Sequence, residues 1–251
     1  MIVRSYARTD VGRKRAHNED AYLCDDEASI FFVADGMGGH AAGEIASAEA
    51  VSTAIGMVRT SLKTVPELRD PLDETAARAA RRAMESAIQA ATYMVYTMAE
   101  LDRDKSGMGT TMTGLWIRGD YAVTGQVGDS RIYQVRDGFA EQLTEDHTLI
   151  AHQLREGLIT LEEARRSPHR NVITRAVGNR EYVQVDTGLF RIEPGDRYLV
   201  CSDGLHGYLR AAEIPMLLEL GGEESVEALV QLANDRGGKD NITAVLVEID
   251  G

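Results

Sequence analysis

The order of helix-like and strand-like segments is the feature that most constrains the fold of this chain. Two proline-free helical segments, residues 42–62 and 73–101, separate a β-rich N-terminal stretch from a longer β-rich stretch. Strands are predicted from apolar runs and alternation at 2–9, 21–26, 29–34, 110–119, 121–129, 131–138, 182–190, 196–204 and 241–249. Because strands and helices are grouped, we expect antiparallel sheets in an α+β protein and not a parallel doubly wound sheet.

Local signals set the ends and faces of these segments. Asp73, just after Pro71, is a predicted N-cap of the second helix. On that helix Met84, Ile88, Ala91, Val95 and Met98 recur at four and three residues and predict a core-facing stripe. The pairs Gly119-Asp120 and Asp137-Gly138 predict tight turns between strands. Short helical segments are also expected near 211–236.

Composition describes an ordinary globular protein. Of the 251 residues, 43% are hydrophobic and 27% are charged, and no repeat or long linker divides the chain, so we predict a single domain over 1–251. The formal net charge of −13 disfavours a nucleic-acid partner. The excess of carboxylates either serves solubility or includes ligands for divalent cations.

The cysteines and the N-terminus indicate the compartment. Cys24 and Cys201 are far apart and form no CxxC pair, so neither a disulfide framework nor a thiolate metal site is expected. The segment "MIVRSYARTD" lacks the apolar core of a signal peptide, and no stretch is long enough for a membrane span. We therefore expect a cytoplasmic protein with no membrane partner.

Acidic residues recur at the ends of five predicted strands. Each follows or precedes an apolar run, and the set comprises Glu19, Asp20, Asp35, Asp129, Asp203 and Asp240. If these ends share one edge of the sheets, mutual repulsion requires raised pKa values or bound cations. Oxygen ligands without paired Cys or His favour Mg²⁺ or Mn²⁺ over zinc. The alternative is that the acids only form turns, since Asp-Gly is a common turn pair.

Six short motifs resemble, in order, those of metal-dependent PP2C-type protein serine/threonine phosphatases, and most of all the bacterial branch. They are "RAHNED" (15–20), "ADGMGGH" (34–40), "GTT" (109–111), "GDSR" (128–131), "SDGL" (202–205) and "DNIT" (240–243). The resemblance implies a four-layer α-β-β-α sandwich, in which helix pairs flank two antiparallel sheets. It also implies two Mn²⁺ or Mg²⁺ ions, with a third, weaker site in bacterial members.

The resemblance also implies a role for each residue of the site. Asp35 would bridge the two metals, and the Gly36 carbonyl would bind one of them. Asp203 and Asp240 would complete the other metal's shell, while Glu19 and Asp20 would act largely through waters. Asp129, with Asp203, would hold the third metal. Arg15 would bind the phosphate, a task that suits a planar guanidinium, although a surface ion pair is the plain alternative.

The implied reaction is hydrolysis of phosphoserine and phosphothreonine monoesters by a hydroxide that bridges the metals. The alkoxide leaving group then needs a proton. Many relatives place a histidine two residues after the bridging aspartate, but this chain has Met37 there. His40 is the candidate general acid; its alternative role is to cap the helix that follows.

Residues 145–180 form an arginine-rich insertion that matches the flap subdomain of bacterial relatives, and we call this segment the flap. Six arginines gather in it: Arg155, Arg165, Arg166, Arg170, Arg175 and Arg180. They either guide phosphopeptides or form a solvated face paired with Glu156, Glu162 and Glu163. His147 and His169 are interpreted as structural.

The sequence therefore predicts a monomeric phosphatase that acts on phosphorylated proteins and reverses serine/threonine kinase signalling, with a cognate kinase or its substrates as partners. Two other functions remain open. One is a catalytically inactive protein that binds phosphoproteins on the same fold. The other is a metal phosphoesterase for small metabolites, which is disfavoured because no separate small-ligand motif is evident.

Overall fold

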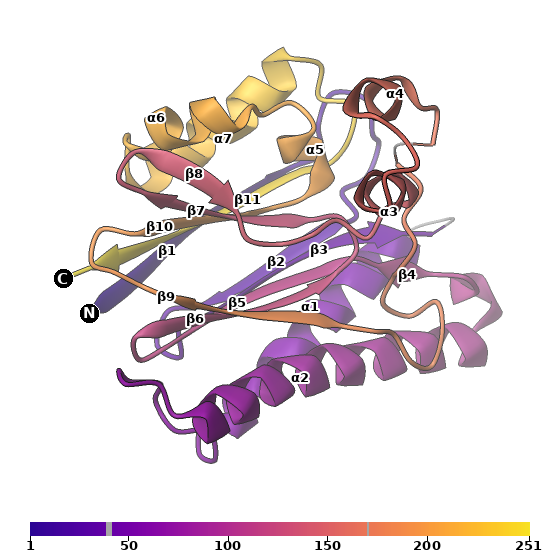
Figure 1. Ribbon diagram of the computed structural model, residues 1–251. Helices are drawn as coiled ribbons and strands as arrows, with labels where there is room; N and C mark the ends of the chain where they lie inside the picture. The colour runs from indigo at the N-terminus through magenta and orange to yellow at the C-terminus, as the bar shows by residue number, and fades with distance from the viewer. Residues whose placement is uncertain (39–41, 170) are drawn as a thin grey trace.

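The computed structural model describes residues 1–38, 42–169 and 171–251. Two antiparallel sheets lie face to face, and helices cover the outer face of each (Figure 1). The first sheet contains, in spatial order, β1 (Ile2–Asp10), β11 (Ile242–Asp250), β10 (Arg197–Cys201), β7 (Arg131–Arg136) and β8 (Phe139–Gln142). The second contains β2 (Asp20–Asp25), β3 (Ile30–Met37), β5 (Met112–Arg118), β6 (Tyr121–Val127) and β9 (Asp186–Arg191), and β4 (Gly109–Thr110) pairs with the end of β3. The predicted α+β class is confirmed.

Strand β3 shows why an unbroken apolar run lies in this fold. Its side chains alternate between two cores, because successive residues of a strand point to opposite faces. Phe31 and Val33 pack against the other sheet, whereas Ile30 and Phe32 pack against the helices. All four side chains are fully buried. A central strand with both faces covered needs apolar residues at every position.

Helices α1 (Ala42–Ser61) and α2 (Glu74–Leu101) cover the second sheet. Asp73 caps α2 as predicted, since its side chain accepts a hydrogen bond from the Thr75 N–H. The predicted stripe is buried from Met84 to Val95, and Met98 packs at its edge. A short 3-10 turn, Arg103–Lys105, follows α2.

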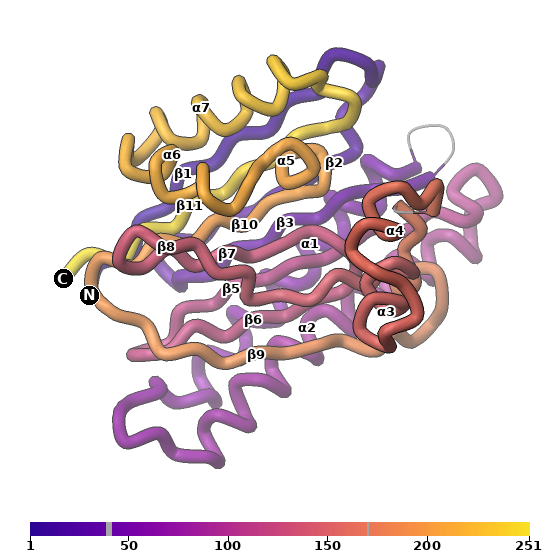
Figure 2. Tube along the Cα trace, turned by 45° about the horizontal axis from the view of Figure 1, so that its top comes forward, coloured from indigo at the N-terminus to yellow at the C-terminus, as the bar shows by residue number. Residues whose placement is uncertain are grey.

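The first sheet is covered by α5 (Asp203–His206), α6 (Ile214–Leu218) and α7 (Gly222–Asp235), with a 3-10 turn at Ala211–Glu213. The flap contains α3 (Leu149–Arg155) and α4 (Leu161–Arg166), which lie together at the end of the sheets opposite the chain termini (Figures 1 and 2). None of the helices in the described parts of the chain has both the length and the apolar character needed to cross a membrane.

The structure differs from the sequence predictions at one strand boundary and by one additional strand, and it excludes the alternative that Asp35-Gly36 forms a turn. The strand predicted at 182–190 begins only at Asp186, and β8 was not predicted. The Asp35-Gly36 pair is not a turn, because β3 continues to Met37 by pairing with β4. Propensity favours a turn at Asp-Gly, but the tertiary pairing partner overrides it.

Candidate active site

The backbone of Asp35 is held in place by hydrogen bonds with Thr110 and Thr111. Its N–H donates to the Thr111 hydroxyl oxygen at 2.9 Å, and its carbonyl accepts from the Thr111 N–H and the Thr110 hydroxyl, both at 2.9 Å. The "GTT" motif therefore fixes the direction of this strand end. Asp20 lies opposite Asp35 in the β2–β3 register, so two carboxylates emerge side by side.

Gly36 is required by the close approach of two other segments. A Cβ built at this position would lie 2.1 Å from the Gly43 carbonyl oxygen and 2.6 Å from the Glu19 carbonyl oxygen. Glu19 in turn accepts a hydrogen bond from the Gly36 N–H at 3.0 Å. Only glycine lets β3, the start of α1 and the 11–19 loop meet here.

Asp20 connects the two sheets. Its Oδ2 accepts hydrogen bonds from the hydroxyls of Ser202 and Thr243, each at 2.7 Å. Its Oδ1 is buried and has no partner among the described residues. One oxygen of this carboxylate is thus fixed by protein donors while the other is left for a ligand.

Asp203 and Asp240 come from the other sheet. Asp203 begins the short helix α5, separated by one residue from the end of β10 at Cys201, so this Asp-Gly pair starts a helix and does not form a turn. Asp240 precedes β11. Its neighbour Asn241 holds the 11–19 loop: the Asn241 side chain donates to the Val11 and His17 carbonyls and accepts from the Glu19 N–H.

Arg15 lies against these acids. Its Nη2 is 2.8 Å from Asp240 Oδ2, and its Nη1 is 3.9 Å from Glu19 Oε2. The side chain is 46% exposed, so the guanidinium contacts the carboxylates on one side and faces solvent on the other. A phosphate approaching from solvent could be met by such a fork.

Asp129 is buried in the turn between β6 and β7. Its carbonyl oxygen lies 2.9 Å from His206 Nε2. Arg131 follows in the "GDSR" motif and is held by Asp146 through two contacts, Nε to Oδ1 at 2.8 Å and Nη2 to Oδ2 at 2.6 Å. This bidentate pair ties the Asp129 turn to the start of the flap.

A cavity of about 500 Å³ opens at these acids. The flap contributes Asp146, Thr148 and Asn171 to its lining, and Tyr208 and Lys239 also line it. Its acidic members are Asp129, Asp146, Asp203 and Asp240. This cavity therefore joins the acidic strand ends to the arginine-rich flap.

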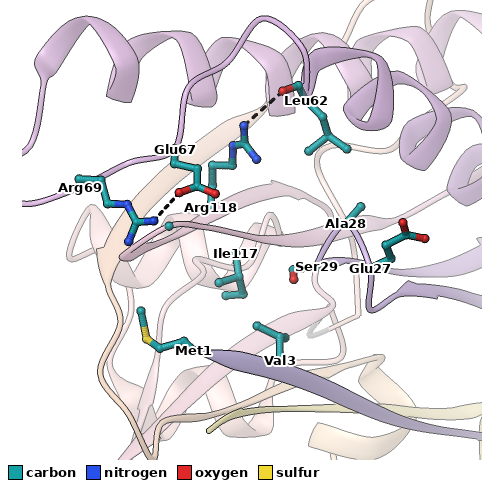
Figure 3. A pocket seen from close by; sticks show the side chains of 11 residues that line it. Met1, Val3, Glu27, Ala28, Ser29, Leu62, Glu67, Arg69, Ile117 and Arg118 are labelled. Carbon is teal, nitrogen blue, oxygen red and sulfur yellow. Dashed lines mark hydrogen bonds and ion pairs between the residues drawn. The ribbon is translucent and has the colours of Figure 1, made fainter. Parts of the chain in front are cut away.

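A second cavity, of about 310 Å³, lies elsewhere (Figure 3). It is lined in part by the turn joining β2 and β3, at the opposite end of these strands from Asp20 and Asp35. Both of its arginines are already engaged: Arg118 donates to the Leu62 and Val65 carbonyls, and Arg69 pairs with Glu67. We therefore place the candidate active site in the first cavity.

Burial and mutual repulsion raise the pKa values of the clustered acids. Burial is the largest cause in each case, followed for Asp35 and Asp129 by neighbouring carboxylates. The pKa of Asp20 is raised to about 6, although hydrogen bonds from Thr243 and Ser202 oppose the shift, and that of Asp129 is raised to about 7. The pKa of Asp35 rises well above its usual range, and that of Asp203 is also raised. Such a cluster favours a bound cation.

Comparison with known proteins decides the family. The sequence pattern of the family described as protein phosphatase 2C matches residues 11–247. The chain belongs to the protein phosphatase 2C family. It is 38% identical over 248 residues to "Serine/threonine phosphatase stp" of Listeria innocua, covering 96% of this chain and 94% of that one. It is 35% identical to "Protein phosphatase PhpP" of Streptococcus pneumoniae, covering 96% of each.

Solved structures agree with this membership. The serine/threonine phosphatase PstP/Ppp of Mycobacterium tuberculosis superposes with a TM-score of 0.87 at 33% identity and covers the whole of both chains. A catalytic domain of PstP in complex with two manganese ions gives a TM-score of 0.83 at 33% identity, over 99% of each chain. This member of the protein phosphatase 2C family is thus a protein serine/threonine phosphatase of the metal-dependent type.

The donors in this phosphatase fit hard divalent cations. The clustered acids all offer oxygen atoms, and Asp20 Oδ1, buried and without a partner in the described part of the chain, is a polar atom that a cation or its water would satisfy. Within the described ranges, no three Asp, Glu, His or Cys side chains already stand together as a metal shell. The fit therefore rests on donor chemistry, with waters completing the coordination, as Mg²⁺ commonly requires.

The structure places every predicted site residue except one. Glu19, Asp20, Asp35, Gly36, Asp129, Asp203, Asp240 and Arg15 lie in one connected cluster. His40 lies outside the described residues, as does Arg170 of the flap. Ser202, Thr243 and Asn241 were not assigned roles from sequence. Their signal was their position, since each small polar side chain lies within three residues of a motif aspartate.

The arginines of the flap are partly paired with acids. Arg155 contacts Glu145 and Glu156, and Arg166 contacts Glu162. Arg175 contacts Asp186 at the start of β9. These contacts favour the solvated-face interpretation for Arg155 and Arg166. Guidance of phosphopeptides by Arg165 stays a prediction.

Proposed function

We propose that this phosphatase hydrolyses phosphoserine and phosphothreonine in phosphorylated proteins at the 500 Å³ cavity, using two Mn²⁺ or Mg²⁺ ions. The observation that carries the proposal is the meeting of Asp20 and Asp35 from one sheet with Asp203 and Asp240 from the other. A family match over residues 11–247 supports the same chemistry.

Each acid has a proposed place at the cations. Asp35 and the Gly36 carbonyl, with Asp203, Asp240, Glu19 and Asp20, would hold the two ions, and Asp129 with Asp203 would hold a third. When bound, such ions lower the pKa of a coordinated water and offset charge on the phosphoryl oxygens. The Asp35 backbone is fixed by Thr110 and Thr111, so this carboxylate is oriented before any ligand binds.

Arg15 would orient the phosphate. In the structure it spans Asp240 and Glu19, which keeps the guanidinium at the mouth of the acidic cluster. A planar fork of N–H donors can bind two phosphate oxygens at once. Arg15 would thus recognise the monoester and also balance part of the negative charge around it.

The serine or threonine alkoxide must gain a proton when it leaves. His40 is the proposed donor, since Met37 stands where many relatives carry a histidine. The proposed substrates are proteins phosphorylated by serine/threonine kinases, so the enzyme would reverse that signalling, with a cognate kinase or its substrates as partners.

Hydrolysis of a phosphothreonine peptide tests the proposal. We expect activity with Mn²⁺ or Mg²⁺, loss of activity with EDTA, and loss with Asp35→Asn at every metal concentration. Asp104→Asn is the matched control, because Asp104 is exposed in the 3-10 turn after α2. Activity that survives EDTA would overturn the mechanism. A folded protein that binds the peptide without hydrolysing it would support the inactive phosphoprotein-binding alternative.

A further inference from the structure

His147 is a buried histidine that the proposed chemistry does not use. It is 6% exposed and lies at the point where the chain enters the flap. From the sequence it is interpreted as structural. Its contacts, however, converge on the turn that carries Asp129.

The ring and backbone of His147 both bind Gly128, which precedes Asp129. The Gly128 N–H donates to His147 Nδ1 at 3.1 Å, and the His147 N–H donates to the Gly128 carbonyl at 2.8 Å. Gly128 has a φ of +102°, and a Cβ there would lie 2.6 Å from the Thr111 Cβ. The turn is therefore held between His147 and Thr111, the residue that also fixes the Asp35 backbone.

The other ring nitrogen faces an acid and an arginine. His147 Nε2 is 2.9 Å from Asp186 Oδ2 and 3.1 Å from Arg175 Nη1, and Arg175 Nη1 donates to Asp186 Oδ1 at 2.7 Å. Because Nδ1 accepts from Gly128, the proton of a neutral ring is assigned to Nε2, which donates to Asp186. Burial lowers the pKa of His147; the hydrogen bond with Asp186 opposes this shift, Arg175 reinforces it, and Glu145 opposes it. Because Nδ1 accepts from the Gly128 N–H, it carries no proton and the ring is neutral.

The two ends of the flap meet at this residue. The His147 carbonyl accepts a hydrogen bond from the Thr174 N–H at 2.7 Å, and Thr148 pairs with Ile173 in an isolated antiparallel β-bridge. Arg175, one residue further, completes the contact with Asp186. The His147 backbone thus holds the returning flap at Thr174, and its imidazole contacts Arg175 of the returning flap, Asp186 at the start of β9 and Gly128 of the Asp129 turn.

We propose that His147 is a positioning residue for the phosphatase reaction: its neutral imidazole fixes the Gly128–Asp129 turn and fastens both ends of the flap to it. The inference rests on the proposed function, in which Asp129 holds a cation. A residue that orients a metal ligand commonly changes metal affinity or activity by about 10 to 100-fold when it is replaced.

Two substitutions distinguish the roles of the two ring nitrogens of His147. His147→Asn can place an acceptor near the position of Nδ1, whereas His147→Gln reaches toward the position of Nε2 and loses the acceptor for Gly128. We expect His147→Gln to lower kcat on a phosphothreonine peptide by about 10 to 100-fold and to weaken Mn²⁺ binding. His147→Asn should recover most of that loss. His169→Ala, an exposed flap histidine, is the matched control and should resemble wild type.

Mn²⁺ binding is measured without substrate, by the electron paramagnetic resonance signal of free Mn²⁺, alongside kcat and KM. The proposal would be overturned if His147→Gln had the same kcat and Mn²⁺ affinity as the His169→Ala control. It would also be overturned if a folded His147→Asn lost as much kcat and Mn²⁺ affinity as His147→Gln. A wild-type enzyme without metal-dependent activity would instead contradict the proposed function.

A measurement on the unaltered protein covers the case in which the variants do not fold. Nitrogen-15 NMR of wild-type His147 at neutral pH should show Nδ1 unprotonated and Nε2 protonated, the tautomer that the Gly128 and Asp186 contacts require. A proton on Nδ1 would overturn the proposal without any substitution.

Discussion

The Asp20 carboxylate accepts a hydrogen bond from the Thr243 hydroxyl at 2.7 Å, across 223 residues of chain and from one sheet to the other. Ser202 donates to the same oxygen and also accepts from the Thr243 N–H. These groups fix one oxygen of Asp20 and leave the other buried and without a partner among the described residues. The two sheets thus cooperate in orienting a single proposed metal ligand.

Thr243→Val should weaken metal activation while keeping the fold. Valine preserves the shape but removes the donor to Asp20, so we expect the Mn²⁺ concentration for half-maximal activity to rise by roughly tenfold. Thr92→Val is the control, because Thr92 is equally buried on α2 and its hydroxyl donates to the Ile88 carbonyl, away from the acids. A metal titration of both variants checks this. Identical curves would show that the Asp20 contact does not act on the metal.

Metal binding should stabilise the protein through Asp35. Buried carboxylates repel one another, and a cation removes that repulsion. Mn²⁺ at about one hundred times its dissociation constant should add about 2.7 kcal/mol to the free energy of unfolding, seen as a higher Tm that EDTA reverses. Asp35→Asn should melt no lower than the wild type in EDTA and should lose the shift with Mn²⁺. A full Mn²⁺ shift in this variant would place the cations elsewhere.

The sequence was sufficient to identify the acidic residues of the site, because each lies in a short local motif at a strand end. Asp35, Asp203 and Asp240 could be grouped without any structure for this reason. Their supporting contacts could not be predicted, since the Asp20–Thr243 and Gly128–His147 bonds depend on which strands and loops meet in space. The same holds for the Asp35-Gly36 pair, whose extended form depends on pairing with β4.

His40→Ala tests the proton donor. A phosphothreonine leaving group needs protonation, so we expect turnover on a phosphothreonine peptide to fall by about a hundredfold or more. An aryl phosphate has a good leaving group, and its turnover should change far less. His152→Ala, an exposed histidine of α3, is the control. Equal losses on both substrates would favour the alternative role of His40 as a helix cap.

Asp196 should contribute to the free energy of unfolding and not to phosphatase activity. It is 1% exposed, and Arg136 binds it with Nε to Oδ1 at 2.7 Å and Nη2 to Oδ2 at 2.6 Å, while Gln134 and the Glu193 N–H also donate to it. Asp196→Asn breaks a largely buried ion pair and should cost about 3 to 5 kcal/mol in the free energy of unfolding. Asp235→Asn, at an exposed pair with Arg13, should show no measurable change.

Asp196 should also account for part of the loss of folding stability at low pH. Burial alone would raise the pKa of Asp196, but the hydrogen bonds from Arg136 and the Glu193 N–H lower it below the ordinary value of 3.8. A carboxyl whose pKa is lower in the folded state stabilises the fold above its unfolded pKa and loses that effect as the pH falls through the folded value. The stability gap between wild type and Asp196→Asn should therefore be constant from about pH 7 to 5 and narrow below about pH 4. Urea unfolding across this range measures the gap, and a gap that does not narrow would mean that folding does not lower the pKa of Asp196.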